Sequence, residues 1–515
     1  MLDRYFHQPI HQYIYWIGAF GIAVGLSTSL IVLSLATMLL SANFLLEGAY
    51  KEKIKRLFSN KLGVILLAFF LLHIFGMLWS SNTAYGWHDI KVKLPLLSIP
   101  VVLLGMKPFS KKINDGILLS FVIAVVITSF TNWLVFVLKG FPGTLDTREI
   151  SLFGSHIRFA LLVTFALGCC IHYLIYYQKY RWIAVVFSLW FIYYTIFAEV
   201  LSGYLCIIGL FLFTSFWAIS LLKKRIYFII FSSGLLLLIG TFLFFFLQSE
   251  NVEHIDSKHL PSKTLSGNEY THHPELPYIE NGHYVFIFLC PKELKQEWGK
   301  VSKIPYDSTD EKGQSIYGTL SRYMTSKGLH KDSVGFSKLS AQDIVNVEDG
   351  IASVTYLKSG LFSRFKKIRW ELQKNNNPNG HSILQRLEYW KTAWKIIQEN
   401  SIIGVGTGDV DDAFQAKYTV ENSVLTPENR LRAHQQFLTI WVSFGIFGLI
   451  LFIVIHIVFA REQYRNKSLI GFLFLLIMLI SYLSEDTLET QVGITFFSFF
   501  IAFFAMKKEL KQSEN

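Results

Sequence analysis

Long apolar runs separated by short polar segments dominate the pattern of hydrophobic and polar positions along this chain. A membrane-crossing helix needs about 20 consecutive, mostly apolar residues, and runs of this kind recur on both sides of one long polar stretch. The pattern predicts an all-α polytopic membrane protein with about twelve transmembrane helices. The predicted spans are 13–26, 28–46, 61–79, 90–106, 115–138, 157–177, 183–199, 203–221, 226–247, 435–459, 468–483 and 490–506.

The long polar stretch divides the predicted membrane protein into three parts. We expect a transmembrane bundle of about nine spans over 1–247, a mainly helical extracytoplasmic loop domain over 248–430, and the last three spans over 431–515. The first apolar run leads straight into a second, with a turn expected at 25–29, so no cleavable signal peptide is expected.

Lysine and arginine gather in every second loop between the predicted spans. They occur at 51–56, 107–112, 179–181, 223–225, 461–467 and 507–508, whereas alternate loops such as 80–89 and 483–491 are poor in them. Because short basic loops stay in the cytoplasm, both termini are predicted to be cytoplasmic. The same alternation leaves the 248–430 insert outside.

Composition agrees with this membrane assignment and argues against nucleic-acid binding. The chain is 52% hydrophobic, and its formal net charge of +11 comes mostly from the basic loops. Its mean hydropathy is +0.39. Cys169, Cys170 and Cys206 fall in predicted spans, and Cys290 is alone in the insert, so no intramolecular disulfide is expected there.

A helix is predicted over 381–400 in the insert. Its apolar residues recur at helical spacing and form one stripe: Ile383, Leu387, Trp390, Trp394 and Ile397. Arg386 lies at the edge of that stripe, which is a costly position for a charge that only confers solubility. Two roles are open for this guanidinium, namely an anion contact beside the membrane surface and a salt bridge to Glu388 or to another helix.

Three glycines follow that helix, at Gly404, Gly406 and Gly408. They resemble a phosphate-binding loop, but no Lys-Ser/Thr pair follows them, so the nucleotide-binding pattern fails. The Asp409-x-Asp411 pair could hold a divalent metal, yet the segment is predicted to lie where nucleotide sugars are absent. We therefore expect a structural glycine turn with Asp409 as the N-cap of a helix, and no metal site or cofactor.

His434 lies where charged residues give way to the tenth predicted span. On a helix it would share a face with Leu438, Trp441, Gly445 and Gly448. Glycines three apart allow a neighbouring helix to come close, so that face is expected to pack against protein. An imidazole at the mouth of a bundle can accept a proton from a hydroxyl. A purely structural hydrogen bond to a neighbouring helix is the other role that the spacing allows.

Several cations are predicted to lie near this histidine. Arg432 is close to it in sequence, Arg386 is in the insert, and Arg158 enters a span from the outer side. Guanidiniums around one histidine at a membrane surface suit a lipid-linked dianion. Carboxylates at outer helix ends are expected partners for these cations or contacts for sugar hydroxyls: Glu199, Glu485, Asp486 and Glu489.

The combined motifs resemble the O-antigen ligase and O-antigen polymerase superfamily. The resemblance rests on an Arg and a Trp in one helix, a Gly-x-Gly-x-Gly turn, and a His followed by a Gly-x-x-Gly span. The matching residues are Arg386, Trp390, Gly404, Gly406, Gly408, His434, Leu438, Gly445 and Gly448. The residue after the histidine, commonly Asn in the family, is Gln435 here.

This resemblance implies a GT-C-type membrane glycosyltransferase that acts without a metal or cofactor. The donor would be a glycan on undecaprenyl diphosphate, and the acceptor a sugar hydroxyl of lipid A–core or of another glycan, at the outer face of the bacterial inner membrane. His434 would be the catalytic base, whereas Arg386, Arg158 and Arg432 would bind the diphosphate.

Four alternatives to the ligase remain open at this stage. Two belong to the same superfamily, a polymerase of lipid-linked O-antigen or capsule repeat units and a protein O-oligosaccharyltransferase. The third is a transporter of lipid-linked sugars, which should place charges at mid-membrane depth and show internal repeats. The fourth is a membrane scaffold, for which cations gathered around one histidine would have no purpose. Besides lipid substrates, the expected partners are membrane lipids and no nucleic acid.

Overall fold

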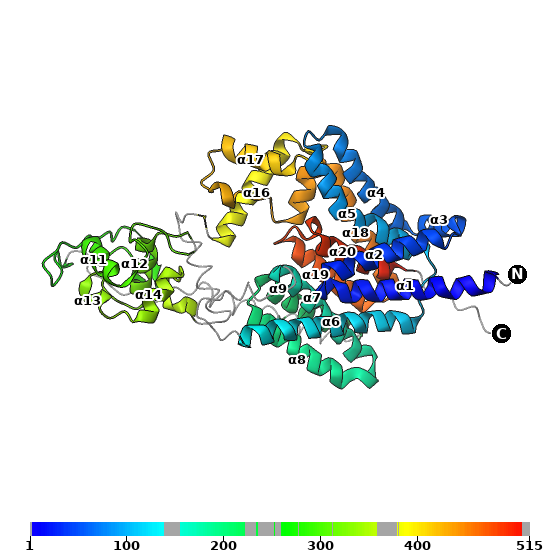
Figure 1. Cartoon of the computed structure of the whole chain (residues 1–515), viewed down its shortest axis with the longest axis horizontal. Coiled ribbons are helices and arrows are strands. Elements are labelled where there is room, and N and C mark those ends of the chain that lie inside the picture. The colour runs from blue at the N-terminus through cyan, green and yellow to red at the C-terminus, as the bar shows by residue number, and fades with distance from the viewer. Residues whose placement is uncertain are drawn as a thin grey trace.

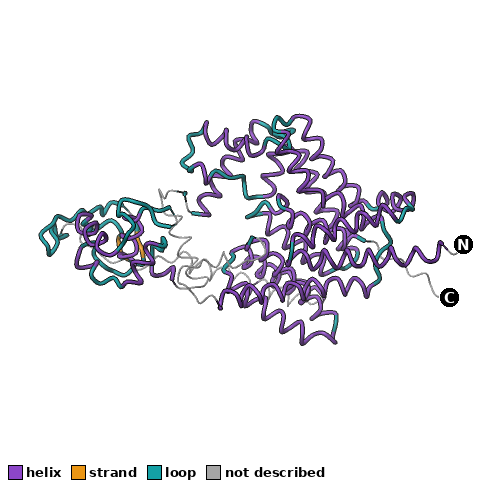
Figure 2. Tube along the Cα trace, in the orientation of Figure 1, coloured by secondary structure: helices purple, strands orange, loops and turns teal. Residues whose placement is uncertain are grey.

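A computed structural model describes residues 3–138, 155–221, 233–234, 252, 259–276, 278–311, 313–357, 378–379 and 381–506. Figures 1 and 2 show a long bundle of helices with both chain termini at one end and a small, separate lobe beyond the other end. The predicted span 226–247 lies almost wholly outside the described residues.

The bundle is formed by helices from both ends of the chain. Its N-terminal part contains α1 (Asp3–Thr28), α2 (Leu30–Leu46), α3 (Tyr50–Ser59), α4 (Lys61–Phe75), the 3-10 helix η1 (Gly76–Trp79), α5 (Thr83–Gly105), α6 (Lys111–Leu138), α7 (His156–Tyr176), η3 (Gln178–Tyr180), α8 (Arg181–Ala198) and α9 (Leu201–Leu221). Its C-terminal part contains α18 (Gln436–Arg465), α19 (Leu469–Tyr482), η6 (Thr487–Glu489) and α20 (Gln491–Ala505).

Six of the described helical segments are long and apolar enough to cross a membrane: Lys61–Trp79, Lys111–Leu138, His156–Tyr176, Gln178–Ala198, Leu201–Ser220 and Gln436–Arg465. The bent pair α2–α3 raises the number to seven if it forms one span, and α19 and α20 are shorter apolar helices. The described helices therefore make this an all-α, multi-pass membrane protein. The number twelve stays a prediction.

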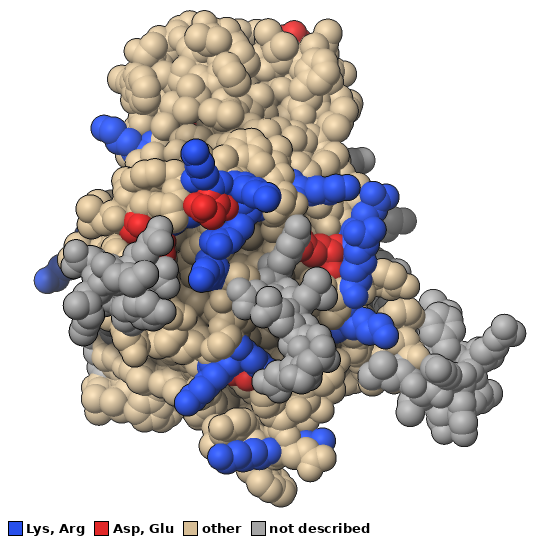
Figure 3. Space-filling view, turned by 90° about the vertical axis from the view of Figure 1, so that its right-hand side faces the viewer, with Lys and Arg blue, Asp and Glu red and all other residues tan. Residues whose placement is uncertain are grey.

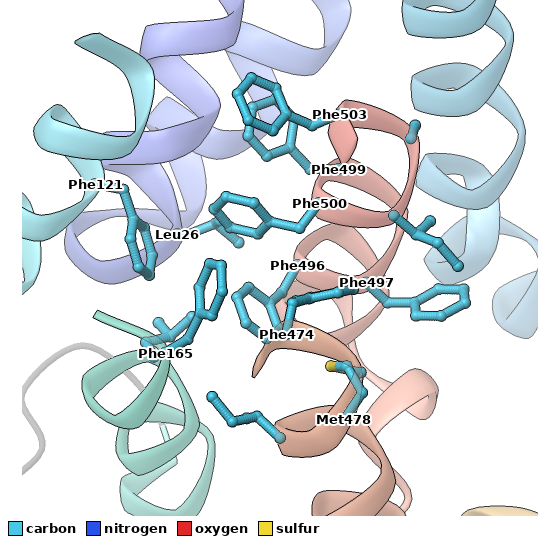
Figure 4. Close-up of a cluster of buried hydrophobic side chains, with 14 of the residues drawn as sticks. Leu26, Phe121, Phe165, Phe474, Met478, Phe496, Phe497, Phe499, Phe500 and Phe503 are labelled. Carbon is cyan, nitrogen blue, oxygen red and sulfur yellow. The ribbon is translucent and has the colours of Figure 1, made fainter. Parts of the chain in front are cut away.

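Aromatic side chains hold the centre of the bundle together (Figure 4). Phe165 of α7 packs edge to face against Phe500 of α20, with ring centroids 4.6 Å apart, and against Phe474 of α19 at 5.5 Å. Lipid tails are as apolar as these rings, so close packing and not burial from water favours their association. Each such aromatic pair adds about 0.5–1.5 kcal/mol.

The end of the bundle near the termini is basic. Between α2 and α3 the chain bends by 119°, and α3 exposes Lys51 and Lys55. Other exposed cations at this end lie in helix ends and in the connections between them: Lys107, Lys111, Lys179, Arg181, Arg461, Arg465 and Lys467. Figure 3 shows Lys and Arg side chains spread over this face among few carboxylates. The basic loops of alternate connections thus gather at one end, as the sequence predicted.

The lobe over 259–357 has a hydrophobic core of its own. It contains the antiparallel hairpin of β1 (Ile279–Glu280) and β2 (His283–Tyr284), then α11 (Pro291–Val301), α12 (Ile316–Ser326), α13 (Ser333–Phe336), α14 (Ala341–Glu348) and η4 (Val354–Leu357). Trp298, Tyr323 and Met324 are fully buried in it. Cys290 is a free, buried thiol.

The described segment 381–430 of the insert packs on the bundle. The helices α16 (Ser382–Glu399) and α17 (Val410–Val420) share a buried cluster with Val442 of α18, and η5 (Pro427–Asn429) follows them. The insert thus contains two parts with separate cores.

The apolar stripe predicted on α16 was wrong in part. Ile397 is buried and Trp390 packs against the buried cluster, whereas Leu387 and Trp394 are 47% and 48% exposed. The other buried residues of the helix are Tyr389, Thr392, Ala393 and Ile396, and the Tyr389 hydroxyl donates to the carbonyl of Asn429.

Candidate functional site

A pocket of about 390 Å³ opens at the end of the bundle opposite the termini. It is lined by α7, α17, the loop before α18 and the loop between α19 and α20. Its charged and titratable lining residues are Arg158, Asp411, Arg430, Arg432, His434, Glu485, Asp486 and Glu489. Residues more than 300 positions apart in the sequence therefore meet in one cavity.

His434 lies in this pocket, but the structure corrects the prediction that it sits on a helix. The helix α18 begins at Gln436, and Gln435 is its N-cap, whose side chain accepts a hydrogen bond from the N–H of Leu438 at 2.6 Å. His434 has a φ of +47°, a left-handed conformation that is uncommon outside glycine. Its N–H donates to Oδ2 of Asp486 at 3.2 Å, which holds the strained backbone in place.

The imidazole of His434 faces an acidic neighbour. Its Nδ1 lies 3.7 Å from Oε2 of Glu485, longer than a hydrogen bond but close enough for an ion pair. Nδ1 is buried and has no hydrogen-bond partner. The ring packs against Tyr389, with centroids 5.7 Å apart. The side chain as a whole is 33% exposed, so the accessible edge of the ring is the one that carries Nε2.

Arg386 is close to the pocket without lining it. Its Nη2 donates to Oε1 of Glu485 at 2.9 Å, its Nε to the carbonyl of Ser484 at 3.2 Å, and its Nη1 to the carbonyl of Ser382 at 3.2 Å. Of the two roles that the sequence left open, the structure shows the salt bridge, to Glu485 and not to Glu388. Whether Arg386 also contacts a substrate stays a prediction.

Arg432 lines the pocket and is surrounded by carboxylates. Its Nη1 lies 3.4 Å from Oε2 of Glu489, and its Nε lies 3.3 Å from Oδ1 of Asp411. Burial alone would lower the pKa of Arg432, but the charge of Glu489, followed by Tyr85, Asp486 and Asp411, raises it above the ordinary value. Glu489 in turn accepts from Nζ of Lys93 at 2.7 Å, and this lysine is 2% exposed.

Arg158 and Arg430 line the pocket and form no ion pair with a carboxylate among the described residues, although Arg158 is close enough to Glu485 and Asp486 to interact with their charges. Arg158, near the start of α7, lines the pocket with no ion pair or hydrogen bond to a described residue. Arg430 donates only to the carbonyl of Leu425 at 3.0 Å and to the hydroxyl of Thr419 at 3.5 Å. Both guanidiniums therefore keep donors for an anionic ligand.

The three carboxylates of the loop after α19 differ in their electrostatics. Burial raises the pKa of Asp486 above its ordinary value, although Arg432 and His434 oppose this effect. Burial would also raise the pKa of Glu485, but His434, Arg386 and Arg158 outweigh it and lower the pKa. Lys93 and Arg432 likewise lower the pKa of Glu489 against the effect of burial. The sequence identified these residues as partners for the arginines, and two of the three form ion pairs with them.

The glycine turn packs between α18 and the segment before α5, and its N–H groups are occupied. Those of Gly404, Val405, Gly406 and Thr407 donate to backbone carbonyls, and that of Gly408 donates to the Ser80 hydroxyl. No donor in this turn is left to hold a phosphate.

Three glycines where the turn meets α18 have positive φ values, namely Gly404, Gly406 and Gly445. Gly404 has a φ of +71°, and a Cβ there would lie 2.4 Å from the carbonyl carbon of Ser443. Gly445, at a φ of +63°, is the kink inside α18 against which Ile402 packs. It therefore receives a loop and not the neighbouring helix that the sequence predicted.

Asp409 also behaves differently from the prediction. It precedes α17 without capping that helix through its side chain. Its carboxylate accepts instead from the N–H groups of Ser81 and Asn82, at 2.8 and 2.7 Å, beside the start of α5. In the part of the chain that the structure describes, no group of three or more His, Cys, Asp or Glu side chains could hold a metal ion.

Comparison with known proteins assigns this region to a family. Residues 350–453 match the family model described as O-Antigen ligase. The O-antigen ligase of Salmonella typhimurium strain LT2 is 33% identical over 102 residues, a match that covers 18% of this chain and 25% of that protein. The chain thus spans about a quarter of the length of this relative. The matched segment includes α16, the glycine turn, His434 and the first half of α18, and over this segment the chain is similar to O-antigen ligases.

Proposed function

We propose that this protein is a membrane glycosyltransferase of the ligase type, with a GT-C-type architecture. It transfers a glycan from undecaprenyl diphosphate to a sugar hydroxyl of lipid A–core at the outer face of the bacterial inner membrane. In this proposal the termini are cytoplasmic and the insert is periplasmic. The similarity to O-antigen ligases supports ligase-type glycan transfer, and the pocket supports the choice of donor.

The observation that carries the proposal is the convergence of one imidazole and three guanidiniums in a single pocket at the end of the bundle. A lipid-linked diphosphate presents two adjacent phosphates at the membrane surface, and guanidiniums match phosphate oxygens with paired N–H donors. Arg158 and Arg430 have no carboxylate within ion-pair distance among the described residues, so they are the donors readiest to receive these oxygens.

The pocket also contains what the transfer step requires. The acceptor oxygen attacks the anomeric carbon of the donor, forming a glycosidic bond while the bond from that carbon to the phosphate oxygen breaks. The hydroxyl proton passes to His434, and the leaving diphosphate keeps the bonding electrons. The pocket arginines stabilise the charge that grows on that oxygen. In this scheme the residues of the chain suffice, and no cofactor or metal is invoked.

Arg432 has a different position from the other two guanidiniums in this scheme. It faces Glu489 and Asp411, so its charge is partly neutralised before a substrate arrives. We propose that it lines the diphosphate site and contributes less to binding than Arg158. Arg386 contacts the donor only if it exchanges a protein partner for a phosphate oxygen.

A gel of cell-surface glycolipids from a strain that lacks the gene tests the proposal. Loss of a ligase leaves bare lipid A–core and polymeric glycan on its lipid carrier, and the intact gene restores capped core. Core that carries a single repeat would instead identify a polymerase. Unchanged lipopolysaccharide together with loss of protein glycans would identify a protein O-oligosaccharyltransferase. If neither surface glycolipid nor glycoprotein changes, the proposal is wrong.

A further inference from the structure

The carboxylate of Glu485 is in a position to orient the buried ring nitrogen of His434. Nδ1 is buried without a hydrogen-bond partner and lies 3.7 Å from Oε2 of Glu485. A neutral imidazole carries its proton on one nitrogen only, so a base that uses Nε2 must keep the proton on Nδ1. A carboxylate beside Nδ1 favours that tautomer and stabilises the imidazolium that forms after proton transfer.

The other carboxylates near His434 have different partners. Asp486 accepts from the backbone N–H of His434 and from the Thr439 hydroxyl, at 3.2 and 2.7 Å. Glu489 accepts from Lys93, Arg432 and Gln436. Glu485 alone directs an oxygen at the imidazole.

Arg386 fixes Glu485 in this position. It donates to Oε1 of Glu485 and to the carbonyl of the preceding residue, Ser484, while its third donor returns to its own helix at Ser382. The side chains of Arg386 and Glu485 are 25% and 11% exposed, so water competes weakly for this contact. Because Oε1 is held by Arg386, Oε2 is the oxygen left for His434.

We propose that Glu485 is a positioning residue for His434 and that Arg386 acts through Glu485 and not by binding the diphosphate. This inference rests on the proposed function, since it assumes that His434 accepts the acceptor's proton. In the reaction, Nε2 takes that proton while Nδ1–H donates to Oε2 of Glu485. The separation of 3.7 Å shortens to a hydrogen bond as the imidazolium forms, because contacts of this kind tighten once substrate is bound.

Two kinetic quantities distinguish positioning from diphosphate binding. A residue that orients the base changes kcat and the acid limb of the pH profile, whereas a diphosphate contact changes the KM for the donor. The charged and titratable groups that face His434 are Glu485, Asp486, Arg158, Arg432 and Tyr389. Of these, only Glu485 is altered in the first variant.

The experiment uses the purified full chain in proteoliposomes with a lipid-linked glycan donor and lipid A–core. E485Q is expected to lower kcat about 10–100-fold with little change in donor KM. In the dependence of kcat on pH, the acid limb of this variant should move to lower pH, because the negative charge of Glu485 that favours the imidazolium is gone. E485D keeps the negative charge, so its acid limb should lie at the same pH as in the wild type while its kcat is reduced. R386K should lower kcat like E485Q, and the double variant should cost little more than either single change, since the two residues act in series.

The matched control is E388Q, a change of the same type on the same helix as Arg386, where Glu388 faces Lys391 at 3.6 Å. This variant should behave as wild type.

If E485Q keeps the wild-type kcat and pH profile while the wild type transfers glycan, the positioning role is wrong and the proposed function stands. If R386K raises donor KM and leaves the acid limb unchanged, Arg386 binds diphosphate. Should E485Q fail to fold, E485D and R386K still decide between these outcomes. If the wild type transfers nothing, the proposed function itself has failed.

Discussion

Most described cations near the termini are exposed, whereas several at the pocket end are buried with carboxylates; Lys53, buried against Glu47 near the termini, is an exception. Near the termini, Lys51, Lys55 and Lys107 are exposed. At the pocket end, Lys93, Arg386 and Arg432 are buried or partly buried, and each contacts a carboxylate. An exposed charge stays hydrated, so it loses little solvation free energy on folding and contributes little to stability. A buried cation is tolerated only with a partner, and removal of one partner leaves the other charge uncompensated.

This difference separates two functions of charge in one membrane protein. In the proposed orientation the exposed cations act through their number, so their individual positions are expected to matter little. The pocket cations act through position, because each one fixes a carboxylate or faces the cavity. Substitutions at the two ends should therefore have very different effects.

The largest effect is expected from His434→Ala, which removes the proposed base from the pocket. Transfer should fall by about 10²–10⁴-fold, measured with purified protein, lipid-linked donor and acceptor. The melting temperature should change little, because the imidazole makes no hydrogen bond to a described residue through its ring. A variant that transfers glycan at the wild-type rate would refute the catalytic role.

Lys93→Gln should cost the most stability. Lys93 contacts both Asp89, at 2.6 Å, and Glu489, at 2.7 Å. Loss of its charge leaves two buried carboxylates without their main partner and should lower the free energy of unfolding by about 3–5 kcal/mol. Thermal unfolding in detergent measures this. Lys51→Gln at the opposite end is the control, with a change of less than about 0.5 kcal/mol, and equal effects would contradict the comparison.

Arg158→Gln should weaken donor binding more than it affects folding. Arg158 lines the pocket with no ion pair to a described residue, and Glu485, whose charge it helps to stabilise, keeps its ion pair with Arg386 when Arg158 is replaced. Donor KM should rise about 10-fold, in line with one lost charge-assisted contact, while the melting temperature stays near wild type. Arg181→Gln, at the basic end, should change neither quantity. An unchanged donor KM in Arg158→Gln would remove this residue from the diphosphate site.

The smallest effect concerns acid stability. The pKa of Glu485 is lower in the folded chain than in the unfolded one, where a glutamate has a pKa of about 4.3. Its ionised form therefore adds stability above the unfolded pKa, and this stability is lost as the pH falls through the folded pKa. As the pH falls below about 4.3, the melting temperature should fall less steeply in E485Q than in wild type. Identical slopes would show that Glu485 is not stabilised as an ion.

The sequence was most informative where the signal is local. Apolar runs located the described helices of the bundle, and alternating basic loops predicted which connections share an end. The mainly helical character expected of the insert also has a local cause at α14, which begins with a capping box between Ser340 and Asp343. The combination of Arg386, the glycine turn and His434 along the sequence was sufficient to indicate the family.

What the sequence missed depends on contacts between distant segments. His434 was placed on a helix because its neighbours are helical, but the contact of its N–H with Asp486, 52 residues away, favours a left-handed backbone. The carboxylate of Asp409 was expected to cap its own helix and instead receives N–H groups 327 and 328 residues away.

The sequence by itself determined the helices, their alternation and the residue types available to the pocket, because hydrophobic length and loop charge act within each segment. Only the tertiary structure decided which carboxylate faces which cation. Glu485 and Glu489 are four residues apart, yet they pair with Arg386 and Lys93 respectively, while Asp486 between them accepts from the backbone N–H of His434. Such pairings depend on how helices from distant parts of the chain pack, and no local pattern encodes that geometry.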